Sequence, residues 1–452
     1  MVKNQTKLLM TLVLLLSFSF AAIPAKAAQW LLRPELIVSE EYSDNIFLTP
    51  DNEEEDFITT AGLGLTLQVL GRTSGLELNY TPSYSAFADN SDLDFWRHAA
   101  HLLLYDELGR NTRLELTGDF LDTEDPTDET ADFTPDDPTS GPGIDADRLR
   151  RSRTRYRTYA AAASLAHQFG ARDNFRLAMR YGQHEDIDTL PGVDVEDYTE
   201  LRPLVGIEYW FTQRWGMETE GYYSNRSYDD ENDREEYTGY IRLLHAFNRQ
   251  LSGYLEYRHT KLDYDRDYDP LADIDYQLYV PSVGIRYEFQ ENALFTLSVG
   301  YLFQDLEDSE EEDDDYGWIV NSEIAKRWLF RTSYFELVGG SGYQIEDRGV
   351  EDLGLNIYYT GRATLGYSFS PRLTGEVYGG YRYDEYPDEE PERDDQTLDA
   401  GALLRYQALQ WMNLELSYTY RDLNSDDADD EYTENRAMLR FVIAPVSPYR
   451  LN

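Results

Sequence analysis

Alternation of apolar and polar side chains along the chain constrains the fold more than any other feature of the sequence. In residues 57–69, Phe57, Leu63 and Leu65 fall on one face, and glycine, threonine and glutamine fill most of the other. A period of two residues is the period of a β-strand with two unlike faces. A turn at 70–74 and a second alternating run follow, which is the pattern of a β-hairpin.

The same pattern predicts about 20 strands, within a margin of roughly 18–22. Most of the runs exceed the ~9–11 residues that a tilted strand needs to cross a bilayer. The strands are expected at 33–42, 57–69, 75–87, 96–106, 112–121, 154–168, 174–185, 198–211, 215–225, 236–248, 251–263, 276–290, 294–305, 317–330, 333–345, 354–369, 373–386, 396–408, 412–424 and 433–443.

The connections between these strands alternate in length. Short turns, such as 70–74 and 249–250, alternate with long connections rich in Asp and Glu, such as 122–153 and 306–316. Outer-membrane barrels have short periplasmic turns, long extracellular loops and an even number of strands. The sequence therefore predicts an all-β, transmembrane, antiparallel up-and-down β-barrel with long acidic extracellular loops. A soluble propeller or a β-solenoid is the alternative, but neither needs two alternating loop classes.

Closure of the barrel is a physical requirement, because hydrocarbon offers no partner for a free N–H or C=O group. We expect the last strand to pair with the first. The terminal aromatic residue of the last strand is either Phe441 or Tyr449. Tyrosines near strand ends suit the membrane surface, and the pairs Tyr222-Tyr223 and Tyr358-Tyr359 are expected there. Packing inside a polar lumen is the alternative for these rings.

The first 28 residues are predicted to be a secretory signal peptide, so that residues 29–452 form the barrel. Lys3 and Lys7 precede an apolar stretch at 8–23, and Ala25-Lys26-Ala27 resembles a cleavage site. The apolar stretch is short for a membrane helix. A retained N-terminal anchor is the alternative. These features place the chain in the outer membrane of a Gram-negative bacterium.

The net charge of −46 argues against nucleic acid as a partner. The chain has no cysteine, which excludes disulfides and thiolate metal sites. The expected partners are outer-membrane lipid and lipopolysaccharide. Divalent ions are a weak expectation for the acidic loops, since no spacing matches an ordered cation loop. We predict no catalytic site, no specific metal site and no cofactor.

Arginines that fall on polar faces are the candidate solute-binding residues. Three of them, Arg153, Arg155 and Arg157, alternate into one predicted strand and would form a basic ladder that attracts anions if their face lines the lumen. The alternative is that these cations neutralise lumen carboxylates such as Glu115 and Glu218. The full candidate set is Arg113, Arg153, Arg155, Arg157, Arg180, Arg362, Arg382 and Arg421.

The stretch Glu41-Tyr42-Ser43-Asp44-Asn45-Ile46-Phe47-Leu48, followed by an acidic insert and Asp56-Phe57-Ile58-Thr59, resembles the start of a family of outer-membrane β-barrel porins. Members of that family are associated with PEP-CTERM/exosortase and exopolysaccharide systems. The resemblance implies an outer-membrane barrel that serves polysaccharide export, with a saccharide polymer and periplasmic export components as partners.

The functional hypothesis is a porin-like channel for hydrophilic solutes that also serves as a conduit for polysaccharide export. The alternative is a structural or adhesive surface barrel without an open pore, whose acidic loops associate with divalent ions.

Overall fold

The computed structural model describes residues 28–125, 153–187, 197–229, 232–265, 275–290, 293–306, 317–347, 352–387, 392–428 and 430–451. Its strands are β1 (Gln29–Ser43), β2 (Asp56–Leu70), β3 (Ser74–Phe87), β4 (Phe95–Glu107), β5 (Thr112–Thr123), β6 (Tyr156–Gln168), β7 (Asn174–Asp186), β8 (Tyr198–Tyr209), β9 (Trp215–Tyr228), β10 (Asp233–Ala246), β11 (Leu251–Asp265), β12 (Tyr276–Gln290), β13 (Ala293–Leu306), β14 (Gly317–Leu329), β15 (Ser333–Asp347), β16 (Asp352–Ser370), β17 (Leu373–Tyr386), β18 (Arg393–Leu409), β19 (Met412–Ser425), β20 (Tyr432–Ile443) and β21 (Tyr449–Arg450). A 3₁₀ turn, η1 (Ser91–Leu93), precedes β4.

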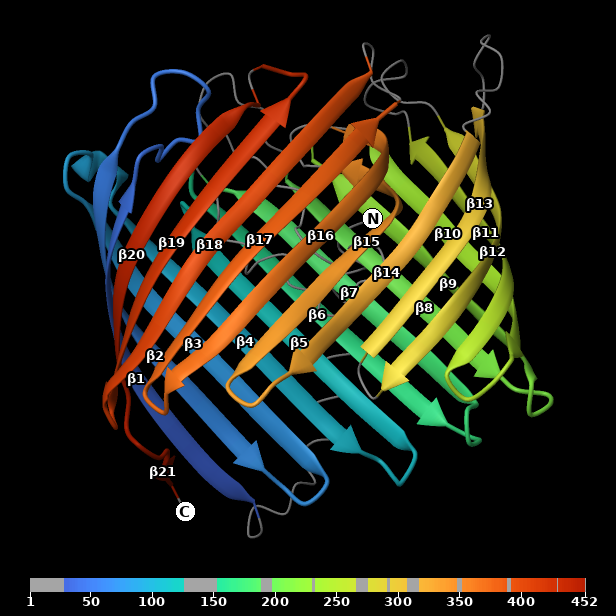
Figure 1. Cartoon of the computed structure of the whole chain (residues 1–452), viewed down its shortest axis with the longest axis horizontal. Coiled ribbons are helices and arrows are strands. Elements are labelled where there is room, and N and C mark those ends of the chain that lie inside the picture. Colours follow the sequence, from blue (N-terminus) through green and yellow to red (C-terminus); the bar gives the residue numbers. More distant parts are fainter. Residues whose placement is uncertain are drawn as a thin grey trace.

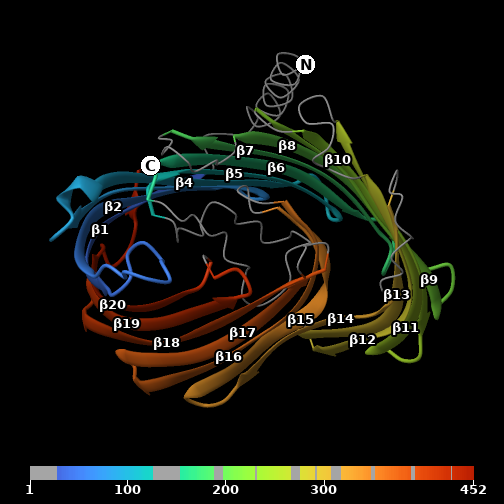
Figure 2. The same ribbon diagram turned by 90° about the horizontal axis from the view of Figure 1, so that it is seen from above.

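The strands close into one antiparallel barrel (Figures 1 and 2). Each of the first twenty strands pairs with its sequence neighbours, and β20 pairs with β1 from Leu36↔Ile443 to Ser43↔Arg436. The short β21 pairs with Leu31 and Leu32, so it continues the edge that β20 leaves. All twenty predicted strands are present, and the predicted closing pair is confirmed.

The two faces of each strand meet different surroundings. In β2, Leu63 and Leu65 are 53% and 42% exposed on the outer surface, whereas Ile58 and Gly62 on the other face are buried. Exposed apolar side chains recur on the outer face of β12, β16 and β19. In a soluble monomer such a surface would be exceptional, whereas a barrel in lipid requires it.

The predicted tyrosine pairs are split between the two faces. Tyr359 points outward and is exposed, but Tyr358 points inward and is buried. Tyr223 contacts the outward Tyr237, whereas Tyr222 lies beneath the guanidinium of the inward Arg202. The expectation that both members of each pair face the membrane is wrong, because adjacent residues of a strand point to opposite sides.

The hairpin of β15 and β16 departs from the simple barrel. The alternation at 354–369 predicts that Leu355 faces lipid together with Tyr359 and Leu365. Instead Leu355 is fully buried inside the barrel, because the end of this hairpin turns into the lumen (Figure 2).

The predicted signal peptide, apart from Ala28, and most of the acidic long connections lie outside the described residues. Among the described residues, no helix is both long enough and apolar enough to cross a membrane.

Candidate solute path

A network of ion pairs lines the inner face of β9–β12. Nη1 of Arg242 and Nη2 of Arg286 each lie 3.1 Å from Oε2 of Glu218, and the Tyr240 hydroxyl donates a 2.8 Å hydrogen bond to the other oxygen. Nε of Arg242 also donates to Glu256 at 2.7 Å. Each contact joins side chains from different strands, so the barrel register assembles the network.

Arginine–tyrosine contacts accompany these pairs. The Arg242 guanidinium lies over the rings of Tyr240 and Tyr254, at 5.0 and 4.4 Å from their centroids. The Arg258 guanidinium also lies over the Tyr240 ring, at 4.9 Å from its centroid. Such cation–π contacts hold the charged heads in fixed positions along the wall.

A second cluster lies on β7–β9 around the Glu200 carboxylate. Nη2 of Arg226 is 3.6 Å from this carboxylate, and the Ser224 hydroxyl donates to it at 2.7 Å. The charges of Arg180 and Arg202 act on the same carboxylate. The cluster therefore adds three arginines and one buried acid to the same side of the lumen.

The facing wall, β16–β20, also carries arginines that pair with carboxylates and stack on tyrosine rings. Nη2 of the buried Arg382 lies 2.7 Å from Oδ1 of Asp384. Nη1 of Arg362 lies 3.7 Å from Oδ2 of Asp399, with its guanidinium 3.9 Å from the centre of the Tyr378 ring. Both walls therefore carry mixed charge, in which guanidinium groups are matched by carboxylates on the same strand or on a strand up to three positions away.

The connection between β1 and β2 lies in the barrel mouth at the long-loop end (Figure 2). Ile46 is fully buried and packs with Ile58, Phe87 and Phe95. Nε of Arg153 donates to the Ile46 carbonyl at 2.7 Å, and the Arg153 guanidinium lies over the Phe87 ring. Burial lowers the pKa of Arg153 from its ordinary value, although nearby carboxylates oppose that change.

Most of the predicted arginines point into the barrel, but they lie on different walls and do not form a single cluster. Arg362, Arg382 and Arg421 are close together on β16, β17 and β19, where Arg421 pairs in register with Asp399. Arg180 belongs to the opposite wall. Arg113 lies at the short-turn end, where Nη2 is 2.7 Å from Glu115.

The predicted ladder of Arg153, Arg155 and Arg157 does not form. Nε of Arg155 and Nε of Arg157 each lie 2.7 Å from the buried Asp122. Asp122 shares a face of β5 with Phe120, which contacts the outward Tyr159. These two arginines therefore belong to the outer face at the rim, while Arg153 alone enters the mouth.

The sequence reading missed Arg242, Arg286 and Glu256 as members of the lumen network. The sequence pattern does indicate a lumen position for these residues, because each of them alternates with outward apolar residues such as Ile241 and Leu255. Among the described residues, no group of three or more His, Asp or Glu side chains is arranged to hold a metal ion.

The chain matches the family described as "Putative beta-barrel porin 2" over residues 19–444. No curated protein matches it. Similar solved structures include OccK5 (OpdH) of Pseudomonas aeruginosa, with 13% identity and a TM-score of 0.40 over 93% of this chain and 99% of that one. OpdK of the same organism, solved with vanillate, has 12% identity and a TM-score of 0.39 over 92% and 99%. A BenF-like porin from Pseudomonas fluorescens Pf-5 has 14% identity and a TM-score of 0.39 over 92% and 99%.

The family match covers most of the sequence and agrees with the closed barrel, its apolar exterior and its charged interior. The chain therefore belongs to the "Putative beta-barrel porin 2" family and is an outer-membrane β-barrel of the porin type.

Proposed function

We propose that this porin carries hydrophilic solutes through its lumen and serves as a conduit for a saccharide polymer. The observation that supports the proposal is the paired-charge lining, centred on Glu218 with Arg242 and Arg286. A barrel of this many strands encloses more space than its side chains fill, since 16–18 strands already leave an aqueous channel. The lining therefore offers polar groups to a solute in transit.

A saccharide fits this lining because a sugar hydroxyl both donates and accepts hydrogen bonds. Arginines supply donors along the wall, and carboxylates such as Glu218 and Glu256 supply acceptors. Because both signs of charge are interspersed, neither small cations nor small anions are strongly excluded. Anionic groups on a polymer would compete with the wall carboxylates for the same guanidinium groups.

The expected surroundings follow from this role. Lipid and lipopolysaccharide would cover the apolar outer face, and periplasmic export components would meet the short-turn end. An association with PEP-CTERM/exosortase and exopolysaccharide systems stays a prediction that the sequence resemblance alone supports.

Planar bilayers test the proposal. The refolded mature chain should give stable ohmic steps with weak ion selectivity, and soluble oligosaccharides should block the current transiently. Polyethylene glycol of matched hydrodynamic size is the control, since it cannot donate hydrogen bonds along its chain. Absence of ion permeation would contradict the channel, and equal block by both polymers would contradict the saccharide preference.

A closed surface barrel is the second candidate. The observation that favours it is the filling of the mouth by two inward segments, namely the β1–β2 connection around Ile46 and the end of the β15–β16 hairpin around Leu355. Persistent absence of conductance, together with divalent-ion binding by the intact protein, would support this candidate.

A further inference from the structure

The end of the β15–β16 hairpin separates from both neighbouring strands. Pairing of β15 with β14 stops at Ser322↔Ser341, whereas pairing of β15 with β16 continues to Asp347↔Asp352. On the other side, β16 joins β17 only from Ile357↔Glu385. Residues 342–347 therefore pair, among the described strands, only with β16, and residues 352–356 only with β15; these two ranges are called the tip here.

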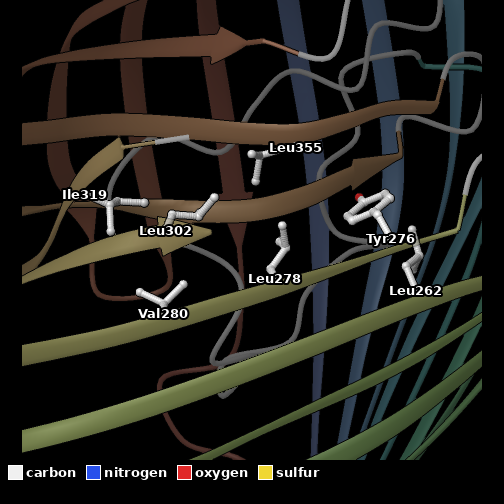
Figure 3. Close-up of a cluster of buried hydrophobic side chains, with 7 residues drawn as sticks. All are labelled: Leu262, Tyr276, Leu278, Val280, Leu302, Ile319 and Leu355. Carbon is white, nitrogen blue, oxygen red and sulfur yellow. The ribbon is translucent and has the colours of Figure 1, made fainter. Parts of the chain in front are cut away.

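The tip is seated on the inner wall through an apolar face. Leu355 belongs to a buried cluster with side chains from the lumen face of β11–β14 (Figure 3). Tyr343 and Ile345 pack against that cluster. The partners of Leu355 in this cluster are Leu262, Tyr276, Leu278, Val280, Leu302 and Ile319. In this position the tip crosses part of the lumen (Figure 2).

The inward tip leaves an interruption in the wall. Residues 317–321 of β14 pair with β13 on one side, but no described strand pairs with them on the other. A hydrogen bond still joins the two strands at this point, since the Ser341 hydroxyl donates to the Val320 carbonyl at 2.7 Å. Trp318, which is 79% exposed, marks this edge as part of the outer surface.

The same tip could complete the wall. Extending the β14–β15 register by two residues beyond Ser322↔Ser341 places Tyr343 opposite Val320. In that position Tyr343, Ile345 and Leu355 would share the lipid-facing side with Tyr359. The apolar face of the tip therefore has two apolar environments, the interior cluster and the membrane, and an outward tip also gives the β14 edge its missing partners.

Both strands of the tip contain a glycine near the point where the tip must bend. A Cβ atom on Gly342 would lie 3.1 Å from the Tyr358 hydroxyl and 3.2 Å from Oδ1 of Asn321. Gly354 has φ +66°, a conformation that other residues rarely adopt. The paired part of β15 next to the tip contains Gly339 and Gly340 as well. A few such positions are sufficient to absorb the dihedral changes of a hinge.

We infer that the tip is a two-position gate of the channel. Seated inward, it narrows the lumen and leaves the wall interrupted beside β14. Moved outward, it pairs with residues 317–321, seals the wall and widens the lumen. This inference rests on the proposed channel function, and it adds the element that regulates it.

Cross-linking tests the gate directly, because the chain has no cysteine of its own. Oxidation of a refolded Val320→Cys/Tyr343→Cys variant should trap the outward tip and raise the conductance until reductant is added. A thiol cross-linker on Leu278→Cys/Leu355→Cys should hold the inward tip and keep the conductance low. Failure of the first pair to cross-link, or a conductance that neither cross-link changes, would overturn the gate.

Single substitutions give an independent readout. Leu278→Ser removes an apolar partner of the inward tip from the fixed wall of β12 and leaves the outward position unchanged, so it should raise the ratio of open to closed time by roughly tenfold or more. Val283→Ser is the matched control, since Val283 lies on the same strand and is exposed outside. An equal effect of both variants would overturn the gate. Absence of conductance in every variant, including the one trapped with its tip outward, would instead contradict the proposed channel.

Discussion

Asn356 and Asp384 join the inward tip to the charged wall of the lumen: Nδ2 of Asn356 lies 2.9 Å from Oδ1 of Asp384. The same carboxylate receives the guanidinium of Arg382, with Nη2 at 2.7 Å. All three side chains are almost completely buried. One ion pair therefore positions both the wall and the tip.

Removal of Arg382 tests this junction. Arg382→Ala leaves the Asp384 charge buried without its cation, which should lower the free energy of unfolding by about 3–5 kcal/mol. Arg405→Ala is the control, because the Arg405 side chain is half exposed and its pair with Glu415 should contribute less than about 1 kcal/mol. Urea unfolding of the refolded barrel measures both. Equal losses would show that Arg382 is not held as the structure has it.

The Glu218 network sets the ion preference of the lumen. Arg242→Met removes one positive charge between Glu218 and Glu256, so the reversal potential in a salt gradient should shift towards cation selectivity. Glu256→Gln should shift it towards anions. Both shifts should shrink at high salt, because screening shortens the range of the charges.

Lys261→Met is the control for these variants. Lys261 pairs in register with Tyr237, which is exposed on the outer face, so this change also removes one positive charge but not from the lumen. An unchanged reversal potential is expected. A shift as large as that of Arg242→Met would mean that the lumen charges do not determine selectivity.

Because Arg155 and Arg157 lie on the outer face, we expect their removal to change the stability of the barrel but not its ion selectivity. The double change Arg155→Met/Arg157→Met should leave ion selectivity unchanged. It should nevertheless lower the free energy of unfolding by about 1–3 kcal/mol, since Asp122 stays buried without its two donors. A clear shift in selectivity would instead return these arginines to the lumen.

Asn45 fixes the segment that fills the mouth. Its amide donates to the carbonyls of Thr49 and Thr433 at 2.8 and 3.1 Å, and its oxygen accepts the Thr49 N–H at 3.1 Å. Asn45→Ala should therefore loosen residues 44–55, which faster proteolysis in this segment would reveal. Asp51→Ala, at an exposed position, should leave proteolysis unchanged. Equal cleavage of both variants would contradict the role of Asn45.

Local alternation was sufficient to predict most of the strands, because lipid-facing side chains such as Leu63 recur at every second residue. The stretches 96–105 and 160–163 alternate too weakly to be predicted as strands on their own. The ion-pair network could not be predicted in the same way. Glu218 and Arg286 are 68 residues apart, and only the register of four strands brings them together. The rim arginines were placed wrongly because alternation does not tell the outer face from the lumen face. The register of β5 and β6 pairs Arg157 with Asp122, and Arg155, which precedes β6, bonds to the same carboxylate.

The inward tip was missed for a different reason. Alternation reports that Leu355 needs an apolar environment, but it does not tell lipid from a buried cluster inside the barrel. The stretch around Asn45 and Ile46 resembles the family in sequence, but the sequence does not indicate that it fills the mouth of the barrel. That role follows from the packing of Ile46 with Phe87 and Phe95.

Spin labels on β12 test the central claim most directly, namely that outward side chains contact acyl chains while their neighbours face water. Val283 is 58% exposed on the outer face, and the adjacent Ser282 points into the lumen opposite Glu256. In lipid vesicles, a label at Val283→Cys should be relaxed mainly by oxygen, and a label at Ser282→Cys mainly by a water-soluble nickel chelate. Preference for the nickel chelate at Val283 would contradict the account.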